Sequence, residues 1–599
     1  VITSDDIRRS GATTIADALR LAPGVEVARI DANKWAISIR GFQDRLSRSV
    51  LVLVDGRAVY SPLFAGTYWE AQDTLLADID RIEVIRGPGG AIYGANAVNG
   101  VINIITRSAR DTQGVYATAA GGTEERWRFG ARYGGSVGED FHWRVYAKGF
   151  EREPMYHRTT DDFDLWRQVQ GGFRCDWTAG EADLVTAQGD IYVGEAGDHR
   201  DISSYDPPSI AAKEGEDHLG GGNVVSRWTH RFAERSTLQV QAYYDRTQRR
   251  ELNYKEERDT FDLQAQHEVA LPLGQDLIYG VEYRLSSGLA HGIETIVFDP
   301  ARRTEQLFAA FLQDEVTLVP DLLKVTAGCK LEHNVYTGFE VHPSGRIALT
   351  PAPDHLIWAA VSRTVRAPSR VDRDLEATIF AAPGPVYVRQ IGDGAFRSER
   401  LLAVEAGYRF APVDWLAGDA ALFYDRYSDL ESPLVGSAFV ETAPGEPTRF
   451  VLPVFLRNGF DANAYGAEVA LDWVPVRGWR LRGAYSFLKL DLSGLDLAAQ
   501  ARTEESSPVN QLSARSSIDL PGDVELDATV RYVDDLPARG VGSYTTIDAR
   551  VAWHPTEHVE VFAVGQNLLE DHHAEFPGDG SAALVDIRRS AYAGVTIRW

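Results

Sequence analysis

The strongest constraint on this 599-residue chain is an alternation of apolar and polar side chains that begins near residue 112 and continues to the end. In residues 127–133, tryptophan, phenylalanine, alanine and tyrosine alternate with arginine and glycine. Successive side chains of a β-strand point to opposite faces, so a period of two predicts strands with one apolar and one polar face. The same alternation recurs in 238–245, 261–271, 524–532 and 593–599.

This part of the chain favours one closed sheet over several soluble sandwiches. Many of its predicted strands are long, their polar positions are often charged, and segments with a helical period are almost absent. The chain has no run of about 18 apolar residues, which excludes a helical membrane span, whereas a transmembrane β-strand needs only about ten alternating residues. At roughly 22 residues for each strand and its connection we expect about 22 strands, a barrel so wide that its lumen has to be plugged.

The first 112 residues follow a different pattern, that of a compact α/β segment. Residues Thr14 to Asp17 have the spacing of a capping box, and the apolar side chains from Ile15 to Ala22 then repeat with a helical period. This predicts a short helix that ends at Pro23-Gly24. Strands are predicted at 36–39, 50–54, 82–85 and 101–105.

The composition and the missing motifs exclude several classes of function. A formal net charge of −25 and a pI near 5.0 argue against binding to nucleic acid. The glycine-rich run 86–100 lacks Gly-Lys-Ser/Thr, so it is not a nucleotide-binding P-loop, and GxSxG and HExxH are absent. We therefore expect no enzyme, and any energy for work has to come from outside the chain. Cys175 and Cys329 have no CxxC spacing and are expected to carry no chemistry.

Several sequence runs, in order along nearly the whole chain, resemble the TonB-dependent outer-membrane receptors. The strongest is IDRIEVIRGPGGAIYGANAVNGVINIITR at 79–107, which follows similar runs at 39–42 and 52–57. A terminal aromatic residue, Trp599, ends the last alternating strand, as in that family. Further matching runs lie at 308–318, 361–369, 403–410 and 564–571.

The resemblance implies an all-β membrane protein. A transmembrane antiparallel barrel of 22 strands, residues 113–599, would be closed by an N-terminal α/β plug domain, residues 1–112, folded inside the lumen. It also implies a monomer in the outer membrane of a Gram-negative bacterium, in contact with outer-membrane lipid and lipopolysaccharide. Periplasmic TonB would pull on a TonB box to drive import of a small-molecule nutrient. That box would lie upstream of Val1 and is not present in this sequence.

The frequency of substrates in the family makes a ferric siderophore the first expectation and cobalamin (vitamin B12) the second. Two other classes stay open at this point. One is a soluble or adhesive all-β glycan-binding protein, or a carbohydrate-active enzyme, built from repeated sandwiches. The other is a passive plugged porin or a signalling receptor, which would bind without the TonB motor.

Two groups of plug residues are candidate substrate contacts, because they fall where the family places the plug apices. Aromatic side chains at such a position suit a large, partly apolar ligand, and packing against the barrel wall is the alternative. The first group is Asn33, Lys34 and Trp35, and the second is Tyr60, Phe64, Tyr68 and Trp69.

Four charged residues are candidates for a plug–barrel lock. Arg40 and Arg86 lie in the IRG and IRGP turns of the plug, and Glu405 and Glu468 lie at polar positions of predicted barrel strands. In the family, plug arginines pair with barrel glutamates at such motifs, so we expect these four to pair. Solvated lumen charges are the alternative.

Polar stretches at 194–218, 370–400 and 428–458 are predicted to be extracellular loops. The first of them is rich in acids that could hold Ca²⁺, although a simple acidic loop is the favoured interpretation. No other metal or cofactor is expected. The acids are Glu195, Asp198, Asp201, Asp206, Glu214, Glu216 and Asp217.

Overall fold

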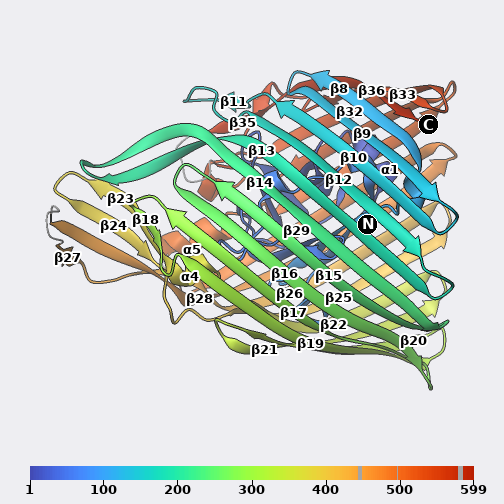
Figure 1. Cartoon of the computed structure of the whole chain (residues 1–599), viewed down its shortest axis with the longest axis horizontal. Coiled ribbons are helices and arrows are strands. Elements are labelled where there is room, and N and C mark those ends of the chain that lie inside the picture. Colours follow the sequence, from blue (N-terminus) through green and yellow to red (C-terminus); the bar gives the residue numbers. More distant parts are fainter. Residues whose placement is uncertain (443–447, 495–496, 578–583) are drawn as a thin grey trace.

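In the computed structural model, which describes residues 1–442, 448–494, 497–577 and 584–599, long antiparallel strands close into a barrel around an N-terminal domain (Figure 1). Within those residues, and leaving aside four short strands in the connections, 22 strands form the wall. The last strand pairs with the first, Ile597 opposite Ala117, so the sheet has no free edge. The wall strands are β8 (Gly114–Gly122), β9 (Glu125–Val137), β10 (Phe141–Arg152), β12 (Trp166–Thr178), β13 (Asp183–Tyr205), β14 (Pro208–Ala233), β15 (Ser236–Arg250), β16 (Tyr254–Leu271), β17 (Gln275–Gly292), β19 (Arg302–Val319), β20 (Leu323–Asn334), β21 (Gly338–Ala352), β22 (His355–Arg366), β25 (Glu399–Val413), β26 (Leu416–Val435), β28 (Arg449–Val476), β29 (Trp479–Ser493), β30 (Asn510–Leu520), β31 (Val524–Val533), β32 (Tyr544–Thr556), β33 (Val559–Gln566) and β36 (Ser590–Arg598).

The predicted alternation sorts the side chains of the wall to its two faces. Phe129 and Tyr133 on β9 are exposed on the outside, and so are Phe261 and Leu263 on β16. Tyr243 on β15 is buried in the lumen. The outer face is therefore apolar along the middle of the wall, as a barrel in lipid requires.

The barrel has two different ends. Tight turns and both chain termini lie at one end, which we call the inner end, and the long connections lie at the other, the outer end (Figure 1). At the outer end β13 continues past Val193, its last exposed apolar side chain, and pairs with β14 up to Tyr205 and Pro208.

The three stretches predicted as loops thus contain regular structure. Residues 194–218 form the extension of the β13–β14 hairpin beyond the apolar band. Two polar strands can satisfy each other's backbone groups without lipid or core contact, which polar composition alone does not reveal. The other two stretches contain α4 (Arg370–Asp374), β23 (Leu375–Ala382), β24 (Val386–Ile391), β27 (Phe439–Glu441) and the outer parts of β26 and β28.

The N-terminal domain fills the lumen with a five-stranded sheet in the order β1-β6-β7-β4-β5, a β2–β3 hairpin and short helices. The predicted helix exists as α2, begins after its cap Thr14, and continues into a 3-10 turn, η1. The sequence analysis missed α1, which is capped by Thr3, because its face is mostly charged. The elements are β1 (Ile2–Thr3), α1 (Ser4–Ser10), α2 (Ile15–Ala18), η1 (Leu19–Leu21), β2 (Val25–Arg29), β3 (Trp35–Ile39), β4 (Val50–Val54), β5 (Arg57–Ala58), η2 (Trp69–Ala71), η3 (Leu76–Asp78), β6 (Ile79–Arg86), α3 (Gly90–Tyr93), β7 (Gly100–Thr106) and η4 (Arg110–Thr112).

The two faces of this sheet have different surroundings. On β7, Ile102 and Ile104 are buried in the main core together with residues of α1, α2 and β2. Asn103 and Ile105, which alternate with them, are only half-buried and line a cavity on the opposite face.

The remaining elements are short. They are β11 (Tyr156–His157), β18 (Ile296–Phe298), α5 (Leu497–Glu504), η5 (Pro537–Arg539), β34 (His572–His573) and β35 (Val585–Arg588). Across the described residues, none of the helices has the length and apolar character needed to cross a membrane.

Candidate functional site

The four residues predicted to pair lie together, where β3 and β6 of the N-terminal domain meet strands β25, β26 and β28. Arg40 Nη2 lies 2.8 Å from Glu405 Oε1, and its Nε lies 3.6 Å from Glu468 Oε1. Arg86 Nη1 lies 2.9 Å from Glu468 Oε2. We call Arg40, Arg86, Glu405 and Glu468 the plug–barrel lock.

The backbone brings these groups close at two special turns. Arg40 has a φ of +56° directly after β3, and its guanidinium lies over the Phe423 ring at 4.1 Å from the centroid. Gly87, after Arg86, has a φ of +83°, and a Cβ there would lie 2.4 Å from Glu405 Oε1. Only glycine leaves room for the glutamate at this conformation.

A third acid, Asp425 on β26, completes the lock and was missed by the sequence analysis. It is fully buried, and one of its oxygens lies 3.6 Å from Arg40 Nη1. Its neighbours on the same face, Phe423 and Tyr427, are aromatic and point inward. Because those neighbours make the inward face look apolar, the period of two gave no sign of a lumen charge there.

The first predicted apex is buried beneath the outer connections. Asn33 Nδ2 donates to Gly197 O at 2.9 Å, and Lys34 Nζ pairs with Asp31 at 2.9 Å and with Asp198 at 3.1 Å. Trp35 packs its ring edge against Trp166, on β12. These three side chains therefore join the N-terminal domain to β12 and β13, and none is open to solvent.

The second apex lies beneath α4 and the start of β16. Tyr68 Oη and Tyr254 Oη are 2.9 Å apart, and Phe64 packs against Tyr254 with ring centroids 5.3 Å apart. Tyr60 Oη donates to the carbonyl of Arg48, while Trp69 is buried in the main core. The backbone N–H groups of α4 bond the carbonyls of Pro62 and Leu63, at 3.1 and 3.0 Å.

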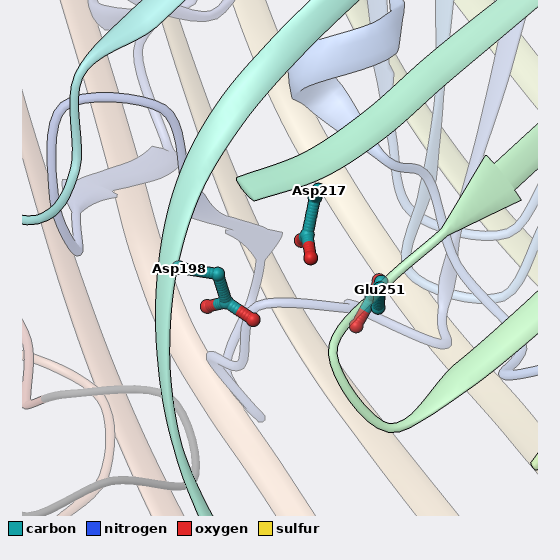
Figure 2. Close-up of side chains that lie close together, drawn as sticks. All are labelled: Asp198, Asp217 and Glu251. Carbon is teal, nitrogen blue, oxygen red and sulfur yellow. The ribbon is translucent and has the colours of Figure 1, made fainter. Parts of the chain in front are cut away.

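Of the seven acids in the predicted calcium stretch, Asp198 and Asp217 come together, and Glu251, which follows β15, joins them (Figure 2). All three are buried, and one oxygen of each lies within 4.8 Å of the others. Glu251 lies outside the stretch that the sequence analysis considered, and only the tertiary fold brings it near. The exposed Asp201, Asp206, Glu214 and Glu216 and the half-buried Glu195 lie outside this trio.

Basic side chains already surround the acid trio. Arg200 lies 2.7 Å from Asp198 and 2.9 Å from Glu251, and Arg249 bonds Glu251. Asp217 is different, because its nearest cation is Arg249 at 3.7 Å and neither of its oxygens accepts a hydrogen bond. Burial, with the charges of Glu251 and Asp198, raises the pKa of Asp217. Burial alone would also raise the pKa of Asp198, but Lys34 and Arg200 lower it.

A cavity of about 630 Å³ lies between the N-terminal domain and wall strands β14 to β20. Of the predicted substrate contacts, Tyr60 and Tyr68 line it. On the side of the N-terminal domain its lining includes Leu51, Leu53 and Asn103, so it covers one face of the five-stranded sheet.

Two family models match this chain. One, described as TonB dependent receptor-like, beta-barrel, matches residues 73–568, and the other, described as TonB-dependent Receptor Plug Domain, matches residues 1–101. The chain belongs to the TonB-dependent receptor family. The receptor therefore has the predicted plug and barrel, and its family is one of receptors and transporters rather than enzymes.

Relatives of this receptor include iron-related proteins that match most of its length. The ferrienterobactin receptor of Escherichia coli K12 is 24% identical over 72% of this chain and 68% of its own. An iron-regulated outer membrane virulence protein of Vibrio cholerae is 23% identical over 96% of this chain and 89% of its own. A vitamin B12 transporter of Vibrio vulnificus is 36% identical, but over only 126 residues, 21% of this chain and 20% of its own.

Solved structures agree on the fold. A variant of the ferric enterobactin receptor of Pseudomonas aeruginosa in complex with enterobactin superposes with a TM-score of 0.80, at 16% identity, and the alignment covers 100% of this chain and 99% of the other. A siderophore receptor from the same species gives a TM-score of 0.75 at 17% identity, with 100% and 98% covered. The closed barrel and these matches do not favour the soluble glycan-binding alternative.

Proposed function

We propose that this receptor imports a ferric siderophore across the outer membrane of a Gram-negative bacterium and that TonB supplies the energy. The observation that carries the proposal is the length of the iron-related matches. They extend over 72% to 96% of the chain, whereas the match to a vitamin B12 transporter extends over 21%. Cobalamin is therefore the less favoured substrate.

The arrangement of the apices supports a step in which ligand binding loosens the plug. Asn33 and Lys34 are held by β13, and the carbonyls of Pro62 and Leu63 are held by α4. A ligand that enters at the outer end and displaces these connections would compete for the same hydrogen bonds. Binding energy would then shift the plug towards a more loosely held state.

The seven predicted apex residues remain proposed substrate contacts. Tyr60 and Tyr68 are the first candidates because they already line a cavity. Asn33, Lys34, Trp35, Phe64 and Trp69 would contact a ligand only after the connections above them have moved. We further propose that the receptor acts as a monomer in outer-membrane lipid and lipopolysaccharide, and that TonB binds a segment upstream of Val1.

Uptake in living cells tests the proposal. The full-length receptor is expressed in a Gram-negative host without its own siderophore and cobalamin receptors, and uptake of radiolabelled ferric enterobactin and cyanocobalamin is measured with and without TonB. We expect uptake of the iron complex only when TonB is present. Equal uptake without TonB would indicate a passive porin, and uptake of cyanocobalamin alone would identify the other substrate class.

A further inference from the structure

The plug is bound to the two sides of the barrel in different ways. On the side of β25 to β31, wall acids pair directly with plug arginines. Besides the lock, Arg8 on α1 lies 2.7 Å from Glu525, and Arg9 lies 2.9 Å from Asp527. Moving the plug away from this side would leave several charges buried without partners, which costs several kcal/mol for each.

On the opposite side, wall charges pair with one another. Arg284 on β17 lies 2.8 Å from Asp262 on β16 and 2.8 Å from Glu282. Arg258 on β16 lies 3.0 Å from Glu305 on β19. As far as the structure describes the chain, β17 and β19 form no hydrogen bond or ion pair with residues 1–112. Separating the plug from these strands therefore breaks no ion pair.

The 630 Å³ cavity fills the space on this second side. Along β15 its lining includes every second residue from Gln239, three positions after the strand begins at the inner end, to Arg249, one position before it ends. The cavity thus follows nearly the whole height of this strand. Its lining is mostly polar there, with glutamine, tyrosine, aspartate and threonine between those two residues.

Two sets of contacts limit the cavity at its edges. Near β14 and β15, Arg57 pairs with Asp245 at 2.9 Å and Arg227 donates to the carbonyl of Asp55 at 2.9 Å. Near β20, the backbone N–H of Ala95 donates to Glu332 at 2.8 Å. Between these edges the plug presents the face of its sheet that carries Leu51, Leu53 and Asn103.

We propose that cargo passes along this side, between the cavity-lining face of the plug sheet and strands β16, β17 and β19. The path needs least rearrangement there, because the wall is neutralised by its own charges and a space with a polar wall along β15 is already present. Its polar wall along β15 and the apolar side chains Leu51 and Leu53 on the plug suit a complex with both oxygen-rich and apolar parts. Only the segment from Arg57 to Tyr68 would have to move at the outer end, while the lock stays closed. This inference rests on the proposed import function.

Thiol labelling tests the route with a matched pair of lumen threonines. In a full-length background with Cys175→Ser and Cys329→Ser, one variant carries Thr260→Cys on β16, in the cavity, and the other carries Thr529→Cys on β31, on the opposite side beside a void of about 60 Å³. Gln264→Cys, also in the cavity, replaces Thr260→Cys if that variant fails to fold. The reagents are methanethiosulfonates of increasing size.

We expect Cys introduced at 260 to react about tenfold faster than Cys at 529 in purified receptor, because thiol labelling depends on access. This first measurement needs no substrate, and equal labelling rates would overturn the proposal. Ferric enterobactin is then the transport probe. A large reagent at 260 is expected to lower import about tenfold while binding changes less than about twofold, because a filled path leaves no room for cargo, and a methyl-sized reagent should have little effect.

The same experiment separates this inference from the proposed function. Unlabelled variants report whether import occurs and whether it needs TonB, which tests the function alone. If unlabelled receptor imports the probe but the large label at 260 leaves import unchanged, or if the label at 529 blocks it equally, the path does not run along β16 to β19.

Discussion

At the scale of single residues, the receptor depends on buried charges whose partners come from distant parts of the chain. The Arg40 and Glu405 side chains are 2% and 7% exposed, so little water is available to replace a lost partner. Arg40 also contacts Asp425 and Glu468, which makes it the shared cation of three acids.

A double-mutant cycle on Arg40→Ala and Glu405→Ala tests this pairing. We expect Arg40→Ala to lower the opening free energy of the plug near Ile39 by about 3 kcal/mol, because it leaves Glu405 buried without its cation. Glu405→Ala should lower it less, because Arg40 keeps Asp425 and Glu468. The double variant should lose much less than the sum. Native-state hydrogen exchange at amides 39–41 measures the effect, and strictly additive losses would show that the two residues do not interact.

Gly87→Ala tests the close approach at the second turn of the lock. The added Cβ would meet both a φ of +83° and Glu405 Oε1 at 2.4 Å, so we expect the lock to weaken by about 2 kcal/mol or more. Gly138→Ala is the control, because its φ is +66° but nothing lies within 4 Å of the new Cβ. Hydrogen exchange near each site compares the two. An equal loss in both variants would mean that backbone strain alone, without the glutamate, explains the effect.

At the scale of elements, the β13–β14 extension connects the outer end of the barrel to the first plug apex through Lys34 and Asp198. Its acid trio carries one carboxylate, Asp217, that the neighbouring bases do not satisfy. The hairpin therefore contains a carboxyl group whose ionised form is destabilising, and this group makes its stability depend on pH.

The direction of this pH dependence follows from the raised pKa of Asp217. For such a group the contribution to stability is complete below its ordinary pKa of 3.8 and is lost as the pH rises through the higher value of the folded state. We expect Asp217→Asn to stabilise the hairpin by about 1–3 kcal/mol at neutral pH and to remove this pH dependence. Hydrogen exchange at amides 196–200, followed as a function of pH, measures the stability of the hairpin. Faster hydrogen exchange in the variant than in the wild type at neutral pH would contradict this expectation.

The same variant tests the calcium prediction, which stays a prediction. If the trio binds Ca²⁺, adding the ion will slow hydrogen exchange in the wild-type hairpin but not in the Asp217→Asn variant. We expect little effect, because Arg200 and Arg249 already neutralise Asp198 and Glu251. Strong calcium-dependent protection in the wild type would establish the metal site.

At the scale of the whole molecule, the plug supplies partners to wall charges of both signs. Its arginines pair with wall acids on β25 to β31, and its acids Asp73 and Asp78 pair with Lys148 on β10 and Arg132 on β9. Glu405, Asp425 and Glu468 lose their arginine partners when residues 1–112 are absent, and so do Glu525 and Asp527 in part, since Arg550 remains beside them. The wall of β16 to β19 keeps its own pairs.

Residues 1–112 carry no formal net charge, so the charge of −25 stays with residues 113–599. A barrel refolded from residues 113–599 should therefore form a cation-selective pore. The reversal potential in a planar bilayer under a KCl gradient measures this selectivity, with the complete receptor as the low-conductance control. Removing two of these negative charges by Glu405→Gln and Glu468→Gln should weaken the selectivity. An anion-selective pore would contradict the charge asymmetry described here.

The sequence was sufficient for the architecture and for part of the site. The period of two fixes which face of each strand meets lipid, since a slip by one residue would expose the charged face. Local signals located the strand β4, whose predicted and observed bounds coincide, and α2, which ends at Ala18 and continues as the 3-10 turn η1 to Leu21. The lock glutamates were expected from the resemblance to the TonB-dependent receptors, and each occupies a polar position between small or apolar neighbours.

Only the tertiary structure decided which distant groups meet. Asp425 and Glu251 gave no local signal, because the barrel brings them to plug residues hundreds of positions away. The predicted apex residues proved to be covered by connections that polar composition had suggested were loops. Local periodicity records which side of a strand faces lipid, whereas partner choice in the lumen depends on how the plug is rotated within the barrel, and no short segment of the chain contains that information.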